Sequence, residues 1–191
     1  MATVGESFDV EWVTIPDPDP ATSTVKLQGI ALGMISFSRL EGLWLGDGKI
    51  YFDATSGGRA GAGQVWEYDP KHDKLKLIYE SPSADVLQSP DNLVYVPHTG
   101  DIWLQEDGAG EQFVRGVTQD GEIYDVARSI LNDSEFCGGC FAPDGRTFFL
   151  NQQGDRGVAA ADIDASGGVT YAIWGPFGGN GNGNGHGHGH D

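Results

Sequence analysis

The sequence has few basic residues, only two cysteines and no long apolar run. Lys and Arg together number 11 in 191 residues, against 28 Asp and Glu, and the formal net charge is −17. A surface of this charge repels phosphate backbones and anionic lipid, so nucleic acid and membrane surfaces are not expected partners. No apolar stretch approaches the length that spans a bilayer. The acidic excess favours either binding of divalent cations or simple solubility of a secreted protein.

The first ten residues are also not expected to be a signal peptide. They include Glu6 and Asp9 and have neither a basic start nor an apolar core. What the sequence does contain is 30 glycines, 9 prolines and 10% aromatic residues. This mixture is typical of many short strands joined by tight turns, and no long helix is expected.

Three consecutive segments share one order of strands and turns. The expected strands are 42–45, 49–55, 64–68 and 75–79 in the first segment, 92–96, 101–106, 112–117 and 122–127 in the second, and 140–142, 146–152, 158–163 and 169–174 in the third. The turn glycines Gly48, Gly100 and Gly145 recur at intervals of about 50 residues, close to the length of a propeller blade. A β-sandwich also strings short strands together, but it would not repeat the same order three times.

The predicted fold is therefore all-β, a partial β-propeller of three four-stranded antiparallel blades plus a strand of a preceding blade. We assign that extra strand to residues 8–15 and treat residues 1–177 as the C-terminal half of a propeller. Blades bury their faces only against neighbours, so open edges favour self-association or a partner chain that supplies the missing blades. Residues 178–191, rich in Gly, Asn and His, are expected to be a disordered tail that either solubilises the chain or binds a transition metal.

A polar cluster, mostly of acidic and amide side chains, stands just before each first strand. They are Arg39 with Glu41, Asp91 with Asn92, and Glu135. First strands lie innermost in a blade, so these side chains should converge at the central channel. Their oxygens suit Ca²⁺, which takes about six to eight oxygen ligands.

A second set stands where each second strand ends. It consists of Asp53 with Thr55, Glu106 with Asp107, and Asn151 with Gln152. The alternative is that Asp and Asn cap turns, which we favour for Asp53 and Asn151. Glutamate is a poor turn former, so Glu41 and Glu106 are the stronger ligand candidates.

The only cysteines form the string Cys137-Gly138-Gly139-Cys140. No helix is indicated that would lower a thiol pKa as in a redox motif. In an extended strand their Cα atoms would lie about 10 Å apart, too far for a disulfide unless the glycines bend the chain. Packed or free thiols, a local disulfide and a metal site all stay open.

Six short strings occur along the chain in a fixed order. They are FSRLEG (37–42), GQVWEYDP (63–70), SPDNL (89–93), EDG (106–108), FAPDG (141–145) and YAIWGPF (171–177). Together they resemble the C-terminal half of the PhoX-type alkaline phosphatases, from about residue 9 to residue 177.

This resemblance implies a secreted or periplasmic phosphomonoesterase on a β-propeller, with calcium (Ca²⁺) and iron (Fe³⁺) ions at the mouth of its channel. By resemblance Arg39 is the catalytic contact to phosphate and Glu41 a metal ligand, while Asp91, Asn92, Glu106 and Asp107 take metal or supporting roles. The family's N-terminal half, which supplies further ligands, has no counterpart here, so we expect little activity from this chain alone.

Two classes of function follow. The first is calcium- and iron-dependent hydrolysis of a phosphate ester, with Arg39 holding the phosphate oxygens. The second is a non-catalytic, calcium-binding structural or self-assembling propeller module. An adjacent reading frame that encodes the missing blades would favour the enzyme.

Overall fold

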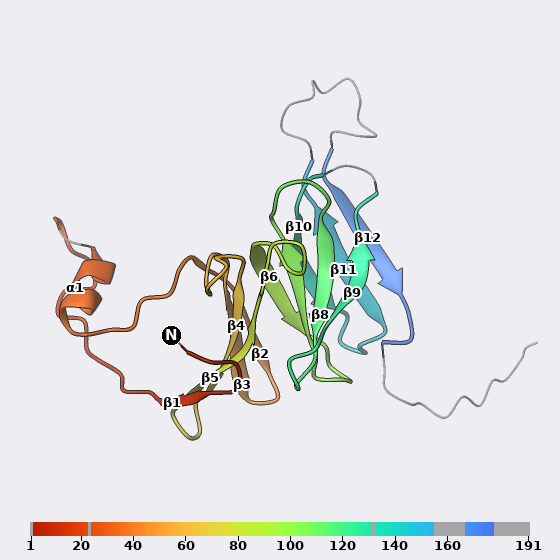
Figure 1. Cartoon of the computed structure of the whole chain (residues 1–191). Coiled ribbons are helices and arrows are strands. Elements are labelled where there is room, and N and C mark those ends of the chain that lie inside the picture. The colour runs from red at the N-terminus through yellow and green to blue at the C-terminus, as the bar shows by residue number, and fades with distance from the viewer. Residues whose placement is uncertain (1, 23, 131–132, 155–166, 178–191) are drawn as a thin grey trace, which may run out of the picture.

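The computed structural model describes residues 2–22, 24–130, 133–154 and 167–177, as one short helix and a series of antiparallel strands (Figure 1). The elements are β1 (Ser7–Asp9), α1 (Val25–Ala31), β2 (Leu40–Gly46), β3 (Lys49–Ala54), β4 (Gln64–Asp69), β5 (Lys74–Glu80), β6 (Pro90–Tyr95), β7 (Ile102–Glu106), β8 (Phe113–Val117), β9 (Ile123–Arg128), β10 (Phe136–Phe141), β11 (Thr147–Gln152) and β12 (Val169–Trp174). They form three sheets of five, four and three strands. The all-β prediction is confirmed.

The first two predicted segments each correspond to one sheet. The sheets have the orders β1-β5-β4-β3-β2 and β6-β7-β8-β9, so consecutive strands from β2 to β5 and from β6 to β9 pair as hairpins. The turn between β2 and β3 shows why. Asp47 and Gly48 both have positive φ, 47° and 74°. This is the conformation of a two-residue hairpin turn that matches the twist of its strands, and an Asp-Gly pair adopts it readily.

The N-terminal strand differs from the prediction. Residues 8–15 were expected to belong to a preceding blade, but only Ser7–Asp9 forms a strand, and it pairs with β5 at the outer edge of the first sheet. Hydrogen bonds from Gly5 N to Leu77 O (2.8 Å) and from Leu77 N to Glu6 O (3.2 Å) extend this pairing. Without this segment the edge of β5 would leave backbone N–H and C=O groups unpaired, and residues 5–9 satisfy them.

The third sheet differs in one position. Val169–Trp174 was expected to be its fourth strand, but β12 pairs directly with β11, with Gln152 opposite Val169. It therefore occupies the third place in the described sheet β10-β11-β12. The predicted strand at 158–163 and the tail at 178–191 lie outside the described residues.

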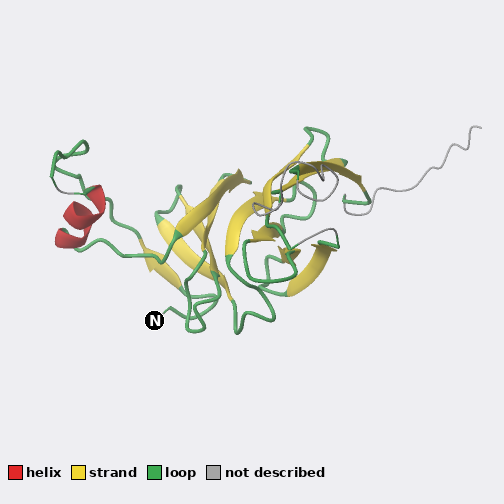
Figure 2. Ribbon diagram, turned by 90° about the horizontal axis from the view of Figure 1, so that it is seen from above, coloured by secondary structure: helices red, strands yellow, loops and turns green. Residues whose placement is uncertain are grey.

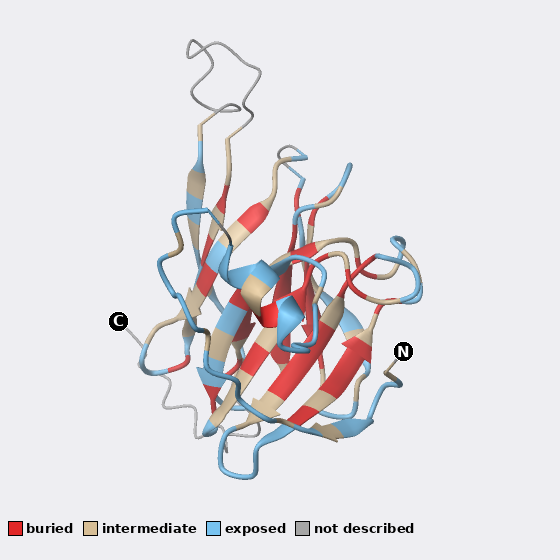
Figure 3. Cartoon of the chain, turned by 90° about the vertical axis from the view of Figure 1, so that its left-hand side faces the viewer, coloured by how far each residue is buried: buried red, intermediate tan, exposed pale blue. Residues whose placement is uncertain are grey.

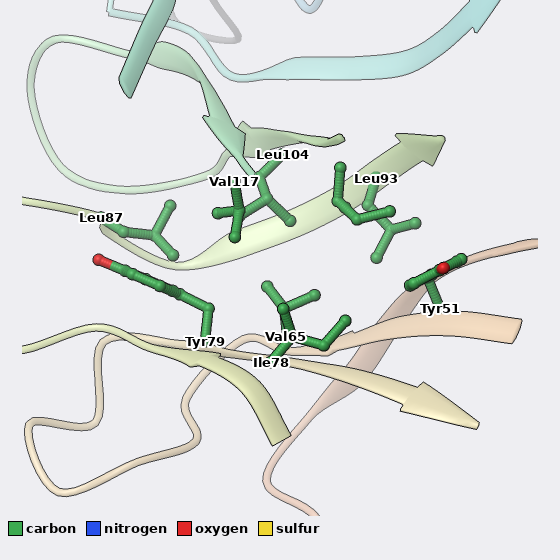
Figure 4. Packing of buried hydrophobic residues seen from close by; sticks show 9 residues of the cluster. Tyr51, Val65, Ile78, Tyr79, Leu87, Leu93, Leu104 and Val117 are labelled. Carbon is green, nitrogen blue, oxygen red and sulfur yellow. The ribbon is translucent and has the colours of Figure 1, made fainter. Parts of the chain in front are cut away.

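Apolar side chains fill the spaces between neighbouring sheets. One cluster joins Tyr51, Val65, Ile78 and Tyr79 of the first sheet to residues of the second, which Figure 4 shows from close by. A second cluster joins the second and third sheets. Its buried members are Val94, Val96, Trp103, Val114, Phe136, Phe148 and Leu150. Full burial of each such side chain stabilises the fold by about 1.5–3 kcal/mol, so these two layers hold the sheets together.

The strands at the inner edges of the sheets lie next to one another. Strand β6 contacts both β2 and β10. Two glycines of β2 permit this approach, because a Cβ on Gly42 would lie 2.8 Å from the backbone nitrogen of Leu93 and a Cβ on Gly46 would run into the Tyr95 ring. The first strands are therefore innermost, as the sequence predicted.

The N-terminal segment covers part of the outer face of the first sheet. Ala2, Phe8, Val10 and Phe37 pack on a buried cluster that includes Trp66 and Leu77. Figure 3 looks onto this end, where buried positions run along the strands and the exposed segment with α1 crosses in front. From above, α1 stands apart from the sheets (Figure 2). Within the described residues no helix is long and apolar enough to cross a membrane.

Candidate metal centre

Three carboxylates meet at one end of the second and third sheets. Asp91 lies in β6, Asp107 directly follows β7, and Glu135 directly precedes β10. One oxygen from each lies within 4.8 Å of the other two. The hydrogen bond from Asp107 N to Ser89 O (3.0 Å) fixes the end of β7 against the start of β6. Three of the six metal ligands predicted from the sequence are thus brought together.

Each innermost strand contains a β-bulge close to this end. The register shifts between Leu40 and Leu43 in β2, between Pro90 and Asn92 in β6, and between Cys137 and Cys140 in β10. A bulge interrupts the alternation of side chains and re-aims the extra residue. In β6 the extra residue is Asp91 itself, which explains how a residue within a strand comes to face the loop residues Asp107 and Glu135.

Asp91 is held by two neighbours from the first sheet. Thr55 donates its hydroxyl to Asp91 Oδ1 (3.2 Å), and Arg39 Nη2 donates to the same oxygen (3.3 Å). Burial raises the pKa of Asp91, and the carboxylates of Glu41 and Asp107 raise it further, while Thr55 and Arg39 oppose the shift. Burial is the main cause of this rise, and the neighbouring carboxylates add to it.

Arg39 stands at the rim of this cluster. Its backbone is left-handed, with φ 56°, and its guanidinium also lies 3.6 Å from Glu41 Oε1. Half of its side chain is exposed to solvent. A guanidinium held by carboxylates yet open to solvent can present its remaining donors to an anion. Glu41 is near Arg39 and Asp91, as predicted, but it is not one of the three clustered carboxylates.

Asn92 and Glu106, the other two predicted ligands, do not belong to the three-carboxylate cluster. Asn92 follows Asp91 in β6, where its backbone pairs with Gln105. Glu106 is buried, and both of its oxygens already accept hydrogen bonds. Oε1 accepts from Gln88 N (2.9 Å) and Arg115 Nε (3.2 Å), and Oε2 accepts from Phe113 N (3.1 Å). Glu106 therefore anchors the interior of the second sheet instead of facing the cluster.

The prediction that Asp53 caps a turn is wrong. Its side chain is fully buried beneath the β2 bulge, where Oδ1 accepts a hydrogen bond from Gly42 N (3.0 Å) and Oδ2 has no hydrogen-bond partner. Burial raises the pKa of Asp53 to about 7, the Gly42 N–H opposes this rise, and the charge of Asp91 adds to it. Asn151 also caps no turn, because its Oδ1 accepts from Thr170 Oγ1 (2.7 Å).

The cysteines lie beyond the three carboxylates in β10. Both are free and half-buried. Burial, with Glu135 as a second cause, raises the pKa of Cys137. Neither sulfur belongs to the carboxylate cluster.

Comparison with solved structures identifies the fold. The chain is similar to Pseudomonas fluorescens PhoX in complex with vanadate, a transition state analogue, with a TM-score of 0.58 and 18% identity over 78% of this chain. The match covers 35% of that longer chain. A family model described as alkaline phosphatase PhoX matches residues 1–155, so this chain belongs to the PhoX alkaline phosphatase family. No curated protein matches it.

Proposed function

We propose that this chain provides part of the active site of a metal-dependent phosphomonoesterase. The observation that carries the proposal is the meeting of Asp91, Asp107 and Glu135 beside the exposed guanidinium of Arg39. Carboxylates suit metal ions and a guanidinium suits phosphate oxygens, and both groups stand at one end of the innermost strands. Membership of the PhoX family supports this reaction class.

The donor set fits hard cations. Asp91, Asp107 and Glu135 offer carboxylate oxygens only, which are the ligands of Ca²⁺ and are also suited to Fe³⁺. Glu41 and Asn92 stand next to this set and would complete it, whereas Glu106 would support it from the interior. When bound, such a cation supplies positive charge that polarises a phosphoryl group.

The chain's own residues bind and orient the substrate. Arg39 is the catalytic contact, since its fork of N–H donors can pair with two phosphate oxygens. Asp91 holds the guanidinium from one side and Glu41 from another. Thr55 fixes Asp91 in turn. These contacts link the first sheet to the second. They fix the orientation in which the guanidinium of Arg39 would meet a phosphate group.

The three sheets are proposed to be three consecutive blades of a larger propeller, made by residues 1–177. The match to 35% of the solved PhoX chain supports a partial domain. The remaining blades would come from another part of the protein, a partner chain or a second copy. By analogy with the family we place the protein in a secreted or periplasmic location, which cell fractionation would test.

A non-catalytic, self-assembling module is the second candidate. It is favoured by apolar side chains on the two outermost faces. Leu43 and Leu45 of β2 are about two-thirds exposed at one end, and Phe149 and Trp174 are exposed at the other. A monomer leaves this surface in water, and a second copy would cover it.

Phosphate binding tests the site. Titration calorimetry with inorganic phosphate in saturating calcium should give measurable binding. Arg39→Asn, which tolerates the left-handed backbone, should weaken it at least about tenfold because charged hydrogen bonds are lost. Arg59→Ala removes another exposed arginine and should leave binding unchanged.

Absence of phosphate binding in calcium, or equal weakening by both arginine variants, would contradict the site. Hydrolysis is a separate test. We expect the chain alone to cleave a phosphomonoester slowly at most. An ordinary enzymatic rate that survives Arg39→Asn would overturn both the assignment of Arg39 and the inference that blades are missing.

A further inference from the structure

The two cysteines occupy an unusual register in β10. Cys137 pairs with Asn151 and Cys140 pairs with Phe149, so two residues of β10, Gly138 and Gly139, stand opposite a single residue of β11. This is a β-bulge with one extra residue. Gly138 has φ 59°. A glycine with left-handed φ in the first bulge position is the arrangement of the G1 type.

The bulge turns both cysteines to the same face of the sheet. Residues paired across strands share a face, and Asn151 and Phe149 are two apart in β11, so they also share one. Phe149 is partly exposed whereas Phe148 and Leu150 are buried, which makes the shared face the outer one. In a regular strand, residues three apart would point to opposite faces.

The bulge also shortens the separation of the cysteines. Their partners are two residues apart, which corresponds to about 6.7 Å between Cα atoms. A regular strand would separate residues three apart by about 10 Å. The shorter value lies at the upper end of the range that a disulfide spans.

The bulge is anchored before any bond forms. Gly139 N donates to Oε1 of the buried Gln105 (3.0 Å), a residue of β7 in the neighbouring sheet. A Cβ on Gly139 would lie 2.8 Å from the Phe148 ring. Packing against the second sheet therefore holds the two thiols on one face in the reduced chain.

We propose that Cys137 and Cys140 form a reversible intrachain disulfide across this bulge, by exchange with a small-molecule disulfide. One cysteine sulfur attacks the small disulfide, which releases one small thiol and leaves a mixed disulfide. The second cysteine sulfur then attacks the first, forms the Sγ–Sγ bond and releases the second small thiol. The two protons and two electrons of the cysteine thiols end on the two released thiols.

The test uses the native, full chain with a chelator present and oxidised glutathione as the probe. We expect a product lighter than the reduced chain by about 2 Da that resists alkylation and carries its bond within the tryptic peptide 129–146. A stable glutathione adduct on either cysteine, or a disulfide-linked dimer, would overturn the proposal. Cys137→Ser and Cys140→Ser are the matched controls and should retain the mixed disulfide.

A second measurement separates the fold from simple proximity in the sequence. The equilibrium constant for disulfide formation should be at least about tenfold larger in the native chain than in guanidinium chloride, because the bulge preorganises the pair. Equal constants would contradict preorganisation. Gly138→Ala should lower the native constant, because a Cβ there would lie 2.9 Å from Asn151 Nδ2 and would oppose the left-handed φ.

Discussion

Asp53 binds the backbone N–H of Gly42 through one carboxylate oxygen and buries the other without a hydrogen-bond partner. Gly42 belongs to the β2 bulge, and the residue before it is Glu41, a predicted ligand. The buried carboxyl therefore supports the backbone on which Glu41 and Arg39 stand. Because this carboxyl group is buried, its ionisation should affect the stability of the fold.

We expect the stability of the chain to fall as pH rises from about 4 to about 7. Burial raises the folded pKa of Asp53 to about 7, above its ordinary value of 3.8. The folded chain thus binds the Asp53 proton more tightly than the unfolded chain. The stabilisation is fully present below the unfolded pKa and is lost as pH rises through the folded pKa. Urea unfolding should show a slope of up to about 1.4 kcal/mol per pH unit from this group.

Asp53→Asn is the matched control for this pH dependence. The amide keeps an oxygen for the Gly42 N–H and cannot ionise, so the slope between pH 4 and 7 should become flatter. An unchanged slope would show that Asp53 does not govern this range.

Calcium should raise the thermal stability of the chain. The carboxylates of Asp91, Asp107 and Glu135 repel one another without a cation, and a ligand that binds only the folded state stabilises it by mass action. At a calcium concentration about 100 times Kd the gain is about 2.7 kcal/mol, or roughly 5–10 °C in Tm for a chain of this size. Differential scanning calorimetry with calcium and with chelator measures this shift.

Asp107→Asn should reduce the calcium shift, whereas Asp120→Asn, in the exposed turn between β8 and β9, should preserve it. Identical melting temperatures of the unmodified chain with calcium and with chelator would remove the proposed cation site.

Glu106→Gln should destabilise the fold without removing the calcium shift. The buried guanidinium of Arg115 would lose its charged partner in the interior, although Asp125 still binds its other end. Breaking a buried pair on one side costs about 3–5 kcal/mol, and the retained amide oxygen places this variant near the lower end. Chemical denaturation gives the loss, and calorimetry with calcium gives the shift. If the calcium shift disappears while stability is preserved, Glu106 is a ligand after all.

Self-association should depend on the exposed leucines of β2. Leu43→Glu places a charge on the outer face of the first sheet and should shift the chain toward monomer. Calcium or salt should strengthen association of the unmodified chain, because both screen the net charge of −17. Sedimentation velocity at micromolar concentration decides, and a monomeric unmodified chain in both conditions would rule out association through these faces.

Local patterns predicted most of the fold. Turn glycines such as Gly48 mark hairpins by their own backbone preference, so the order of the strands could be derived from the sequence. The placement of β1 could not, because its pairing with β5 joins residues far apart in the chain. The direct pairing of Val169–Trp174 with β11 could not be derived either, because the sequence predicted a strand at 158–163 for that place.

The candidate site was predictable only in part. The closeness of Asp91 and Glu135 could be expected from their positions at the starts of two neighbouring strands, whereas their role as metal ligands stays a prediction. The role of Glu106 depends on Arg115, whose pairing with it arises from strand register that the sequence alone does not fix. The bulges at Asp91 and at Cys137 likewise depend on how two strands align, and they decide which way those side chains point.

The cluster of carboxylates lies between two sheets that share no hydrogen-bonded ladder among the described residues. Asp91 and Asp107 belong to the second sheet and Glu135 leads into the third, so apolar packing around Val94 and Phe136 sets the gap between them. A small rotation of one sheet is magnified at its tip. Removal of a methyl group from that core, far from any charge, should therefore change the affinity of the proposed site for a cation. That affinity would then depend on how closely the two sheets pack.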